Sequence, residues 1–191
     1  MIESAKLGAK RTRNPEKINI VPCGVAALGL GLVTLATAIF AENMTNLDEL
    51  ITKINGLSQR AEILGCINSF DYIRKSGRIK LKTLGILGSI ISIKPVLVMH
   101  GTKISLVYKQ FSRKKSLKKL VEEFTKRIDP SIEPKMIGIS HLESENDAKE
   151  IMDKIHAKYQ FHEIILTGTD PMIASYTGPG LIILSYFSKF K

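Results

Sequence analysis

The sequence predicts an α/β fold in which helices flank a mixed β-sheet. Three observations lead to this prediction. Short β-rich segments alternate with longer segments whose apolar residues recur every three or four positions. Two β-rich segments are joined at His100-Gly101-Thr102, which predicts a hairpin. The later strands each follow a helix, and such alternation is typical of a sheet covered by helices.

The bulk composition is that of a folded protein with one good-sized core or two small domains. The chain has 191 residues, of which 44% are hydrophobic and 24% are charged. Its net charge of +10 favours an anionic partner such as nucleic acid, a membrane surface or an acidic protein. Cys23 and Cys66 lie far apart, which predicts two reduced, buried thiols in a cytoplasmic protein.

The most ambiguous segment runs from Ile20 to Ala41 and contains no charged residue. Its length suits a membrane-spanning helix, and its basic lead resembles a secretory signal. Pro22 and Gly24 would break such a helix near its start, however. We therefore expect a short buried strand over 18–21 and a helix over 26–42, with a membrane-anchored or exported protein as the alternative.

The remaining elements follow from hydrophobic periodicity and from capping residues. Asn46 to Glu49 is a capping box that begins an amphipathic helix, and Gly77 is placed to end a later helix. A boundary near Gly77 divides the chain into residues 1–77 and 78–191. The expected strands lie at 63–67, 95–99, 104–108, 136–139, 163–167 and 181–187, and helices are expected near 47–57, 69–77, 117–127 and 148–155.

No pattern in the sequence indicates catalysis. The histidines show no metal-ligand spacing, and neither a nucleophile elbow nor a phosphate-binding glycine loop is present. We therefore expect a non-enzymatic protein without a metal or cofactor. The four histidines are His100, His141, His156 and His162.

A cluster of basic residues around the start of a helix is the strongest polar signal. It is consistent with a solvated helix face, with docking of an acidic partner, or with nucleic-acid binding. A nucleic-acid site would need stacking aromatic residues, and only Phe111 interrupts the cluster. The cluster comprises Lys109, Arg113, Lys114, Lys115, Lys118 and Lys119.

A second candidate is the turn Thr177-Gly178-Pro179-Gly180. Its glycines permit positive φ and expose backbone amides, and Pro179 stiffens the loop. Such a turn can present N–H groups to a carboxylate, although a plain tight loop before the last strand has the same pattern.

The order of several short motifs resembles the DegV family of bacterial fatty-acid-binding proteins. The motifs are Gly77-Arg78-Ile79, Ile93-Lys94-Pro95, the hairpin with its basic helix start, and the turn Thr177–Gly180. The resemblance implies residues 1–77 as the remnant of an N-terminal α/β domain and 78–191 as a C-terminal α/β domain. It also implies non-enzymatic binding of a long-chain fatty acid such as palmitate in an inter-domain apolar tunnel.

The resemblance assigns roles to individual residues. The fatty-acid-binding residues would be Arg78, Tyr176, Thr177, Gly178 and Gly180, beside an apolar wall over 81–99. A fatty acid kinase that phosphorylates the carboxylate would dock on Arg113, Lys114, Lys115 and Lys118. The alternative function is a basic nucleic-acid-binding module that uses residues 109–119.

This chain departs from the family pattern at several positions. Tyr176 stands where the family usually has histidine, Phe111 where it often has arginine, and Pro22-Cys23 where it has Asp-Ser. Family members are longer at the N-terminus, and their head-group threonine and serine fall upstream of Met1. We therefore expect a truncated, divergent member that binds a lipid head group more weakly.

Overall fold

The computed structural model describes residues 2–77, 93–101 and 103–189. Helices and strands alternate along most of this length, as the sequence predicts. The helices are α1 (Ile2–Ala9), α2 (Ala27–Ala41), α3 (Leu47–Arg60), α4 (Asp71–Ser76), α5 (Arg113–Arg127), α6 (Glu145–His156) and α7 (Pro171–Thr177), with a 3-10 turn at Pro15–Lys17. The strands are β1 (Ala61–Cys66), β2 (Lys94–His100), β3 (Lys103–Gln110), β4 (Met136–Leu142), β5 (Glu163–Gly168) and β6 (Leu181–Phe187).

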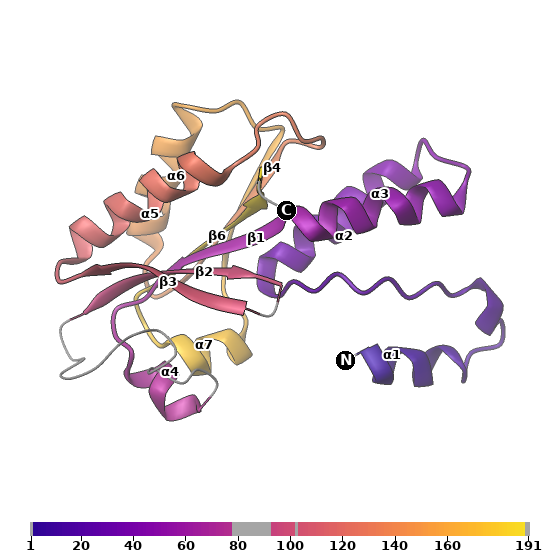
Figure 1. Cartoon of the computed structure of the whole chain (residues 1–191), viewed down its shortest axis with the longest axis horizontal. Coiled ribbons are helices and arrows are strands. Elements are labelled where there is room, and N and C mark those ends of the chain that lie inside the picture. Colours follow the sequence, from indigo (N-terminus) through magenta and orange to yellow (C-terminus); the bar gives the residue numbers. More distant parts are fainter. Residues whose placement is uncertain (1, 78–92, 102, 190–191) are drawn as a thin grey trace.

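The strands form one twisted sheet in the order β3-β2-β1-β6-β4-β5 (Figure 1). β4 and β5 are parallel, and the other neighbours are antiparallel. The sheet is therefore mixed, and the predicted fold class is confirmed. The hairpin of β2 and β3 turns at Gly101, whose φ of +56° is a left-handed conformation that favours glycine.

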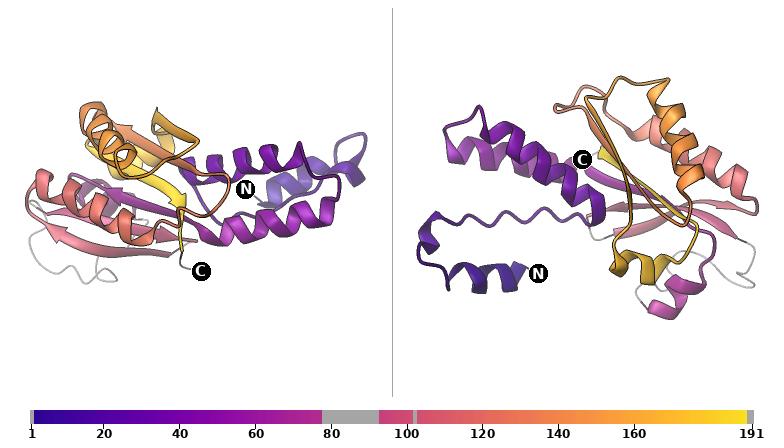
Figure 2. Two further views of the ribbon diagram at one scale, coloured as in Figure 1. Left: turned by 90° about the horizontal axis from the view of Figure 1, so that it is seen from above. Right: turned by 180° about the vertical axis from the view of Figure 1, so that it is seen from behind.

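Helices cover both faces of the sheet, because alternate residues of each strand point to opposite sides. α5 and α6 cover one face, where Leu64 and Cys66 of β1 join a core with Phe124. α4, α7 and the start of α2 cover the other face, where Ile63 packs with Ile183. Figure 2 shows the two layers of helices on either side of the strands.

The α2–α3 pair projects from the end of the sheet where β1 begins (Figure 1). Its packing joins Leu32 and Phe40 of α2 to Ile54 and Leu57 of α3. The predicted capping box is confirmed at its N-cap, since the Asn46 side chain accepts hydrogen bonds from the two backbone amides at 48 and 49.

The predicted strand over 18–21 is wrong. Residues 18–26 form neither a helix nor a strand, and Ile18 is 42% exposed. The segment has no strand beside it in the described part of the chain, and Pro22 lacks an amide for a ladder. The helix that follows is confirmed, with bounds Ala27–Ala41. Within the described residues, no helix combines the length and the apolar character needed to cross a bilayer.

The other predicted strands and helices are present within a few residues of their expected bounds. The predicted boundary at Gly77 falls between β1 and β2, which are adjacent in the sheet. Residues from both sides of this boundary therefore build the same sheet, so it does not separate two sheets. The predicted apolar wall over 81–99 is described only in part, because residues 81–92 lie outside the described residues. Its described end, 93–99, includes the buried residues Val96, Leu97 and Val98.

Candidate functional site

The turn Thr177–Gly180 is held tightly at the end of the sheet where β6 begins. Gly178 has φ +71° and Gly180 has φ +87°, so both need the freedom of glycine. A Cβ at Gly178 would overlap the ring of Tyr72, and a Cβ at Gly180 would overlap the carboxamide of Asn68. The turn therefore packs directly on α4 and on the loop that precedes it.

The backbone amides of this turn already have partners. Gly178 N–H donates to Ala174 O at 2.9 Å, and Gly180 N–H donates to Leu142 O at 2.9 Å. In this structure both amides are therefore taken by backbone carbonyls, as in a plain tight loop, and a lipid-binding role of the turn stays a prediction. The hydroxyl of Thr177 donates to Ile173 O at 2.8 Å and keeps its capacity to accept. Tyr176 is half-buried in the last turn of α7.

Two residues missed by the sequence analysis lie at the same end of the sheet. Asn68 faces Gly180, and the Lys94 ammonium donates to the Asn68 carbonyl at 2.6 Å. Lys94 belongs to the Ile93-Lys94-Pro95 motif, so its position in the sequence was a usable signal. Arg78, the remaining predicted lipid-binding residue, lies outside the described residues.

The basic cluster of α5 divides into a buried part and an exposed part. Arg113 is only 23% exposed and contacts Asp147 of α6 with both Nε and Nη2 at 2.9 Å. Its Nη1 donates to the Cys66 thiol at 3.4 Å. Arg113 therefore joins α5 to α6 and to β1, which differs from the predicted docking role. Lys114, Lys115 and Lys118 are exposed, as a docking role requires.

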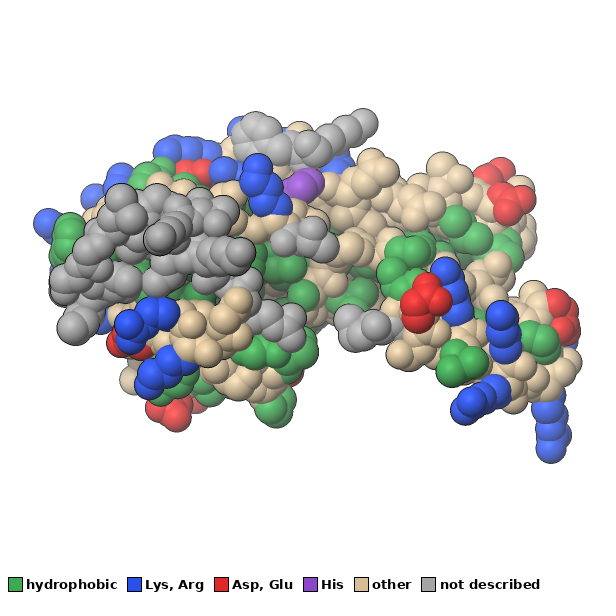
Figure 3. Space-filling view, turned by 60° about the horizontal axis from the view of Figure 1, so that its bottom comes forward, with side chains coloured by type: hydrophobic (Ala, Val, Ile, Leu, Met, Phe, Trp, Pro, Cys, Tyr) green, Lys and Arg blue, Asp and Glu red, His purple; other side chains and the backbone are tan. Residues whose placement is uncertain are grey.

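The surface around these lysines offers little to nucleic acid. Phe111, which is 72% exposed, is the one aromatic residue that interrupts the basic cluster and could stack on a base. Figure 3 views the molecule from the side of α4 and α7, away from α5, and the Lys and Arg side chains on that side are scattered instead of forming one patch. Glu122 pairs with Lys119 at 2.7 Å and with Lys118 at 3.9 Å, which reduces the positive charge of the helix. The arrangement suits limited protein contacts better than a continuous phosphate track.

Both cysteines are free thiols, in line with the sequence prediction. Cys66 is fully buried, and its thiol lies 3.0 Å from the Ser116 hydroxyl. Burial raises the pKa of the Cys66 thiol, which keeps it protonated. Cys23 is half-buried in the segment before α2, so the prediction of burial holds fully for Cys66 alone.

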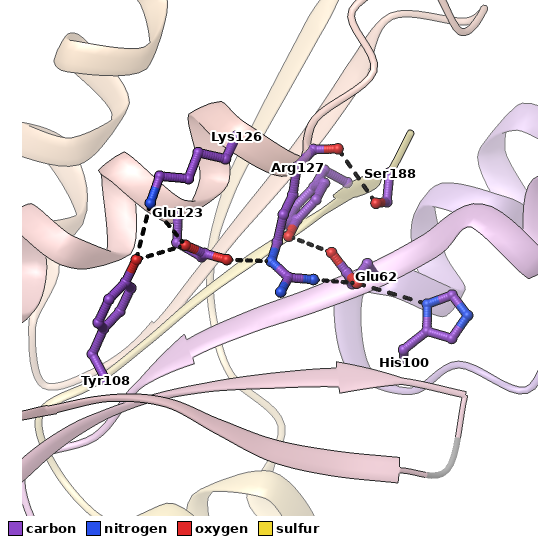
Figure 4. A network of polar contacts seen from close by, with 8 residues as sticks. Glu62, His100, Tyr108, Glu123, Lys126, Arg127 and Ser188 are labelled. Atoms are coloured by element: carbon purple, nitrogen blue, oxygen red, sulfur yellow. Dashed lines mark hydrogen bonds and ion pairs between the residues drawn. The ribbon is translucent and has the colours of Figure 1, made fainter. Parts of the chain in front are cut away.

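A buried polar network crosses the other end of the sheet (Figure 4). Glu62 of β1 is 2% exposed and accepts hydrogen bonds from the Tyr186 hydroxyl at 2.7 Å and from Arg127 Nη1 at 3.0 Å. Burial, and then the charge of Glu62, raise the pKa of Tyr186 well above its usual range. Nδ1 of His100 lies 3.7 Å from the same carboxylate.

The network continues from Arg127 to the surface. Arg127 Nε donates to Glu123 at 2.6 Å, and the Tyr108 hydroxyl donates to the other oxygen of Glu123 at 2.8 Å. Burial raises the pKa of Glu123, but its bonds from Arg127 and Tyr108 outweigh this and lower the pKa below its usual value. Lys126 lies 3.6 Å from Glu123. Two carboxylates and two cations therefore balance within the network before His100 is counted.

The described residues contain no group of three or more His, Cys, Asp or Glu side chains that could hold a metal ion. The geometry defines an α/β protein with a tightly packed glycine turn at one end of its sheet and a buried ion network at the other.

A family model described as "Uncharacterised protein, DegV family" matches residues 1–189. The chain belongs to the DegV family. A DegV domain-containing protein of Clostridium perfringens is 30% identical over 91% of this chain and 60% of its own length. One of Streptomyces coelicolor is 26% identical over 88% of this chain and 59% of its own length. The chain thus spans about three-fifths of the length of these curated relatives.

Solved structures share the fold. A DegV lipid-binding protein of Thermotoga maritima matches with a TM-score of 0.79 and 19% identity, over 98% of this chain and 64% of that protein. A fatty-acid-binding DegV protein of Thermus thermophilus matches with a TM-score of 0.79 and 20% identity, over 97% and 66%. The fatty acid kinase B3 protein of Streptococcus pneumoniae, loaded with linoleic acid, matches with a TM-score of 0.79 and 17% identity, over 97% and 66%.

Proposed function

We propose that this chain binds a long-chain fatty acid such as palmitate, without catalysing a reaction on it, and presents the carboxylate to a fatty acid kinase. The observation that carries the proposal is the position of the turn Thr177–Gly180. In this chain the turn closes one end of a sheet whose fold is shared with solved fatty-acid-binding proteins.

The acyl tail would lie against the sheet face that α4 and α7 cover. Buried apolar residues gather there next to the turn, and hydrocarbon is stabilised by about 0.8 kcal/mol for each buried methylene. The tunnel itself is part of the proposal, and residues 81–92 of the predicted apolar wall lie outside the described residues. The apolar residues are Ile63, Ile67, Phe70, Ile73, Ile93, Leu97, Leu181 and Ile183.

The head group would lie near Tyr176 and Thr177, with Gly178 and Gly180 shaping the loop. The Tyr176 hydroxyl is of a type that can donate to a carboxylate, whereas the Thr177 hydroxyl could do so only after releasing Ile173 O. Neither residue supplies the positive charge of a histidine. Lys94, which lies at the same end of the sheet beside Asn68, is a candidate for that charge. The two free cysteines support a cytoplasmic location, where thiols stay reduced.

Kinase docking would use the exposed lysines of α5, and Arg113 would act only by holding α5 in place. We expect the double variant Lys114→Glu and Lys115→Glu to weaken binding to the kinase. Lys75→Glu, a charge reversal on the exposed side of α4, is the matched control. Equal affinities for the kinase in both variants, measured by titration calorimetry, would contradict docking through α5.

The direct test is a titration with fatty acids of increasing length. If the tail is buried, the dissociation constant should fall about fourfold for each added methylene, from laurate to palmitate. A dissociation constant that does not change with chain length would overturn burial of the tail. Gly180→Ala should weaken binding because it displaces Asn68, whereas Gly168→Ala, whose added Cβ meets nothing within 4 Å, should not.

A further inference from the structure

We propose that a second pocket, at the opposite end of the sheet from the turn Thr177–Gly180, binds a small oxyanion, either a carboxylate or a phosphate. Its volume is about 640 Å³, and it lies between α3, the segment before α2 and the β2–β3 turn. It is lined by Ile2, Pro22, Cys23, Gly24, Asn55, Ser58, Gln59, His100 and Gly101.

The strand register separates this pocket from the proposed lipid site. Glu62, near the start of β1, pairs with His100 and Tyr186, at the ends of β2 and β6. Cys66, at the other end of β1, pairs with Ile182, next to the glycine turn. The two sites therefore lie at opposite ends of the same central strands, and the pocket does not depend on the proposed lipid binding.

His100 brings a positioned hydrogen-bond donor to the pocket wall. Its side chain is 42% exposed, and its Nδ1 lies against the buried Glu62 carboxylate (Figure 4). A carboxylate behind one ring nitrogen orients the imidazole and leaves the other nitrogen to face outward. The two carboxylates and two cations of the network balance, so no net negative charge lies behind the ring. Lys103, the cross-strand neighbour of His100, is exposed and adds a positive charge on this side.

Ser58 also lines the pocket, and its Oγ has no hydrogen-bond partner among the described residues. This Oγ is shielded from solvent, so it would reach a ligand oxygen only after rotation about its Cα–Cβ bond. Such a contact would remove the cost of an unpartnered hydroxyl. Asn55 and Gln59 lie on the same face of α3 as Ser58, at helical spacing, so their carboxamide N–H groups can serve the same ligand.

The pocket has both the charge and the space for an anion. No Asp or Glu is among its lining residues, and the Glu62 carboxylate behind His100 is buried and paired with Arg127. An added Cβ at Gly24 or Gly101 would meet no atom within 4 Å, so both backbone segments border open space. Donors from an imidazole, a hydroxyl and two carboxamides, with no carboxylate among the lining residues, favour an oxyanion over a cation.

The test uses the full chain with histidines labelled for NMR, titrated at constant ionic strength with inorganic phosphate or with succinate. We expect the His100 ring signals to shift and saturate with at least one of the two anions. Saturation by phosphate alone identifies a phosphate site, and saturation by succinate alone identifies a carboxylate site. The proposal is overturned if neither anion saturates, or if all four histidines shift together without saturating.

Two variants locate the site by calorimetry. His100→Gln and Ser58→Ala should each raise the dissociation constant at least about tenfold, whereas His156→Gln, at the exposed end of α6, should leave it unchanged. Ser58→Ala removes a hydroxyl without a partner, so it preserves folding and decides the question if His100→Gln unfolds. Unchanged affinity in Ser58→Ala would overturn the proposed site, and saturating palmitate should not displace the anion.

Discussion

The guanidinium of Arg127 lies 3.0 Å from the Glu62 carboxylate, although 65 residues separate them in the sequence. The contact joins the last turn of α5 to the central strand β1. The same guanidinium also binds Glu123, so a single side chain contacts two largely buried carboxylates. This residue therefore fixes the helix on the sheet at the end remote from the proposed lipid site.

We predict that Arg127→Met lowers the free energy of unfolding by about 3–5 kcal/mol, because it leaves two carboxylates without their shared cation. Urea denaturation at neutral pH measures the change. Lys118→Met, on the exposed side of the same helix, should change stability by no more than about 0.5 kcal/mol. Similar losses in the two variants would contradict the structural role of the network.

Stability should fall at alkaline pH because of Tyr186. Its pKa in the folded protein lies above the unfolded value of about 10. The contribution of Tyr186 to the free energy of unfolding is therefore fully present below pH 10. It is lost as the pH rises above 10, because the phenol then ionises in the unfolded chain but not in the folded protein. Urea midpoints measured across this range should decline less steeply in Tyr186→Phe. An identical decline in both proteins would assign the effect to other groups.

Gly180→Ala should destabilise the protein by at least about 1–2 kcal/mol, since a left-handed conformation is costly for alanine. The new methyl would also overlap Asn68. Gly168→Ala is the matched control, because that glycine has no positive φ and open space beside it. Thermal unfolding of both variants distinguishes a strained turn from a general effect of replacing glycine.

The two thiols should differ in reactivity. Cys66 is buried with a raised pKa, whereas Cys23 is half-buried. A thiol reagent should therefore modify Cys23 quickly in the native protein and Cys66 only after denaturation. In Cys23→Ser no fast reaction should remain. Fast modification of Cys66 in that variant would mean that α5 separates easily from β1.

Local signals in the sequence predicted much of the fold. Asn46 marked the start of α3, Gly77 the end of α4, and Gly101 the turn of the hairpin. α7 was missed even though Asp170 and Pro171 are a good N-cap and first helical residue, with the Asp170 carboxylate accepting from Ile173 N–H. A helix this short has too little periodicity to identify without its cap.

Long-range contacts account for what the sequence could not predict. Glu62 stands in a buried strand, where a charge is uncommon, and only the distant Arg127 and Tyr186 make its burial favourable. The strand predicted at 18–21 does not form, because a β-rich segment becomes a strand only where a neighbouring strand pairs with it. The sequence identified the glycine turn but not the Asn68 side chain that packs on it.

We propose above all that this chain holds a long-chain fatty acid. The most direct measurement is mass spectrometry of lipid extracted from the gently purified, full chain, followed by titration of the delipidated protein with palmitate. We predict a co-purified long-chain fatty acid and saturable binding of palmitate. Protein that carries no lipid and does not bind palmitate would contradict the claim.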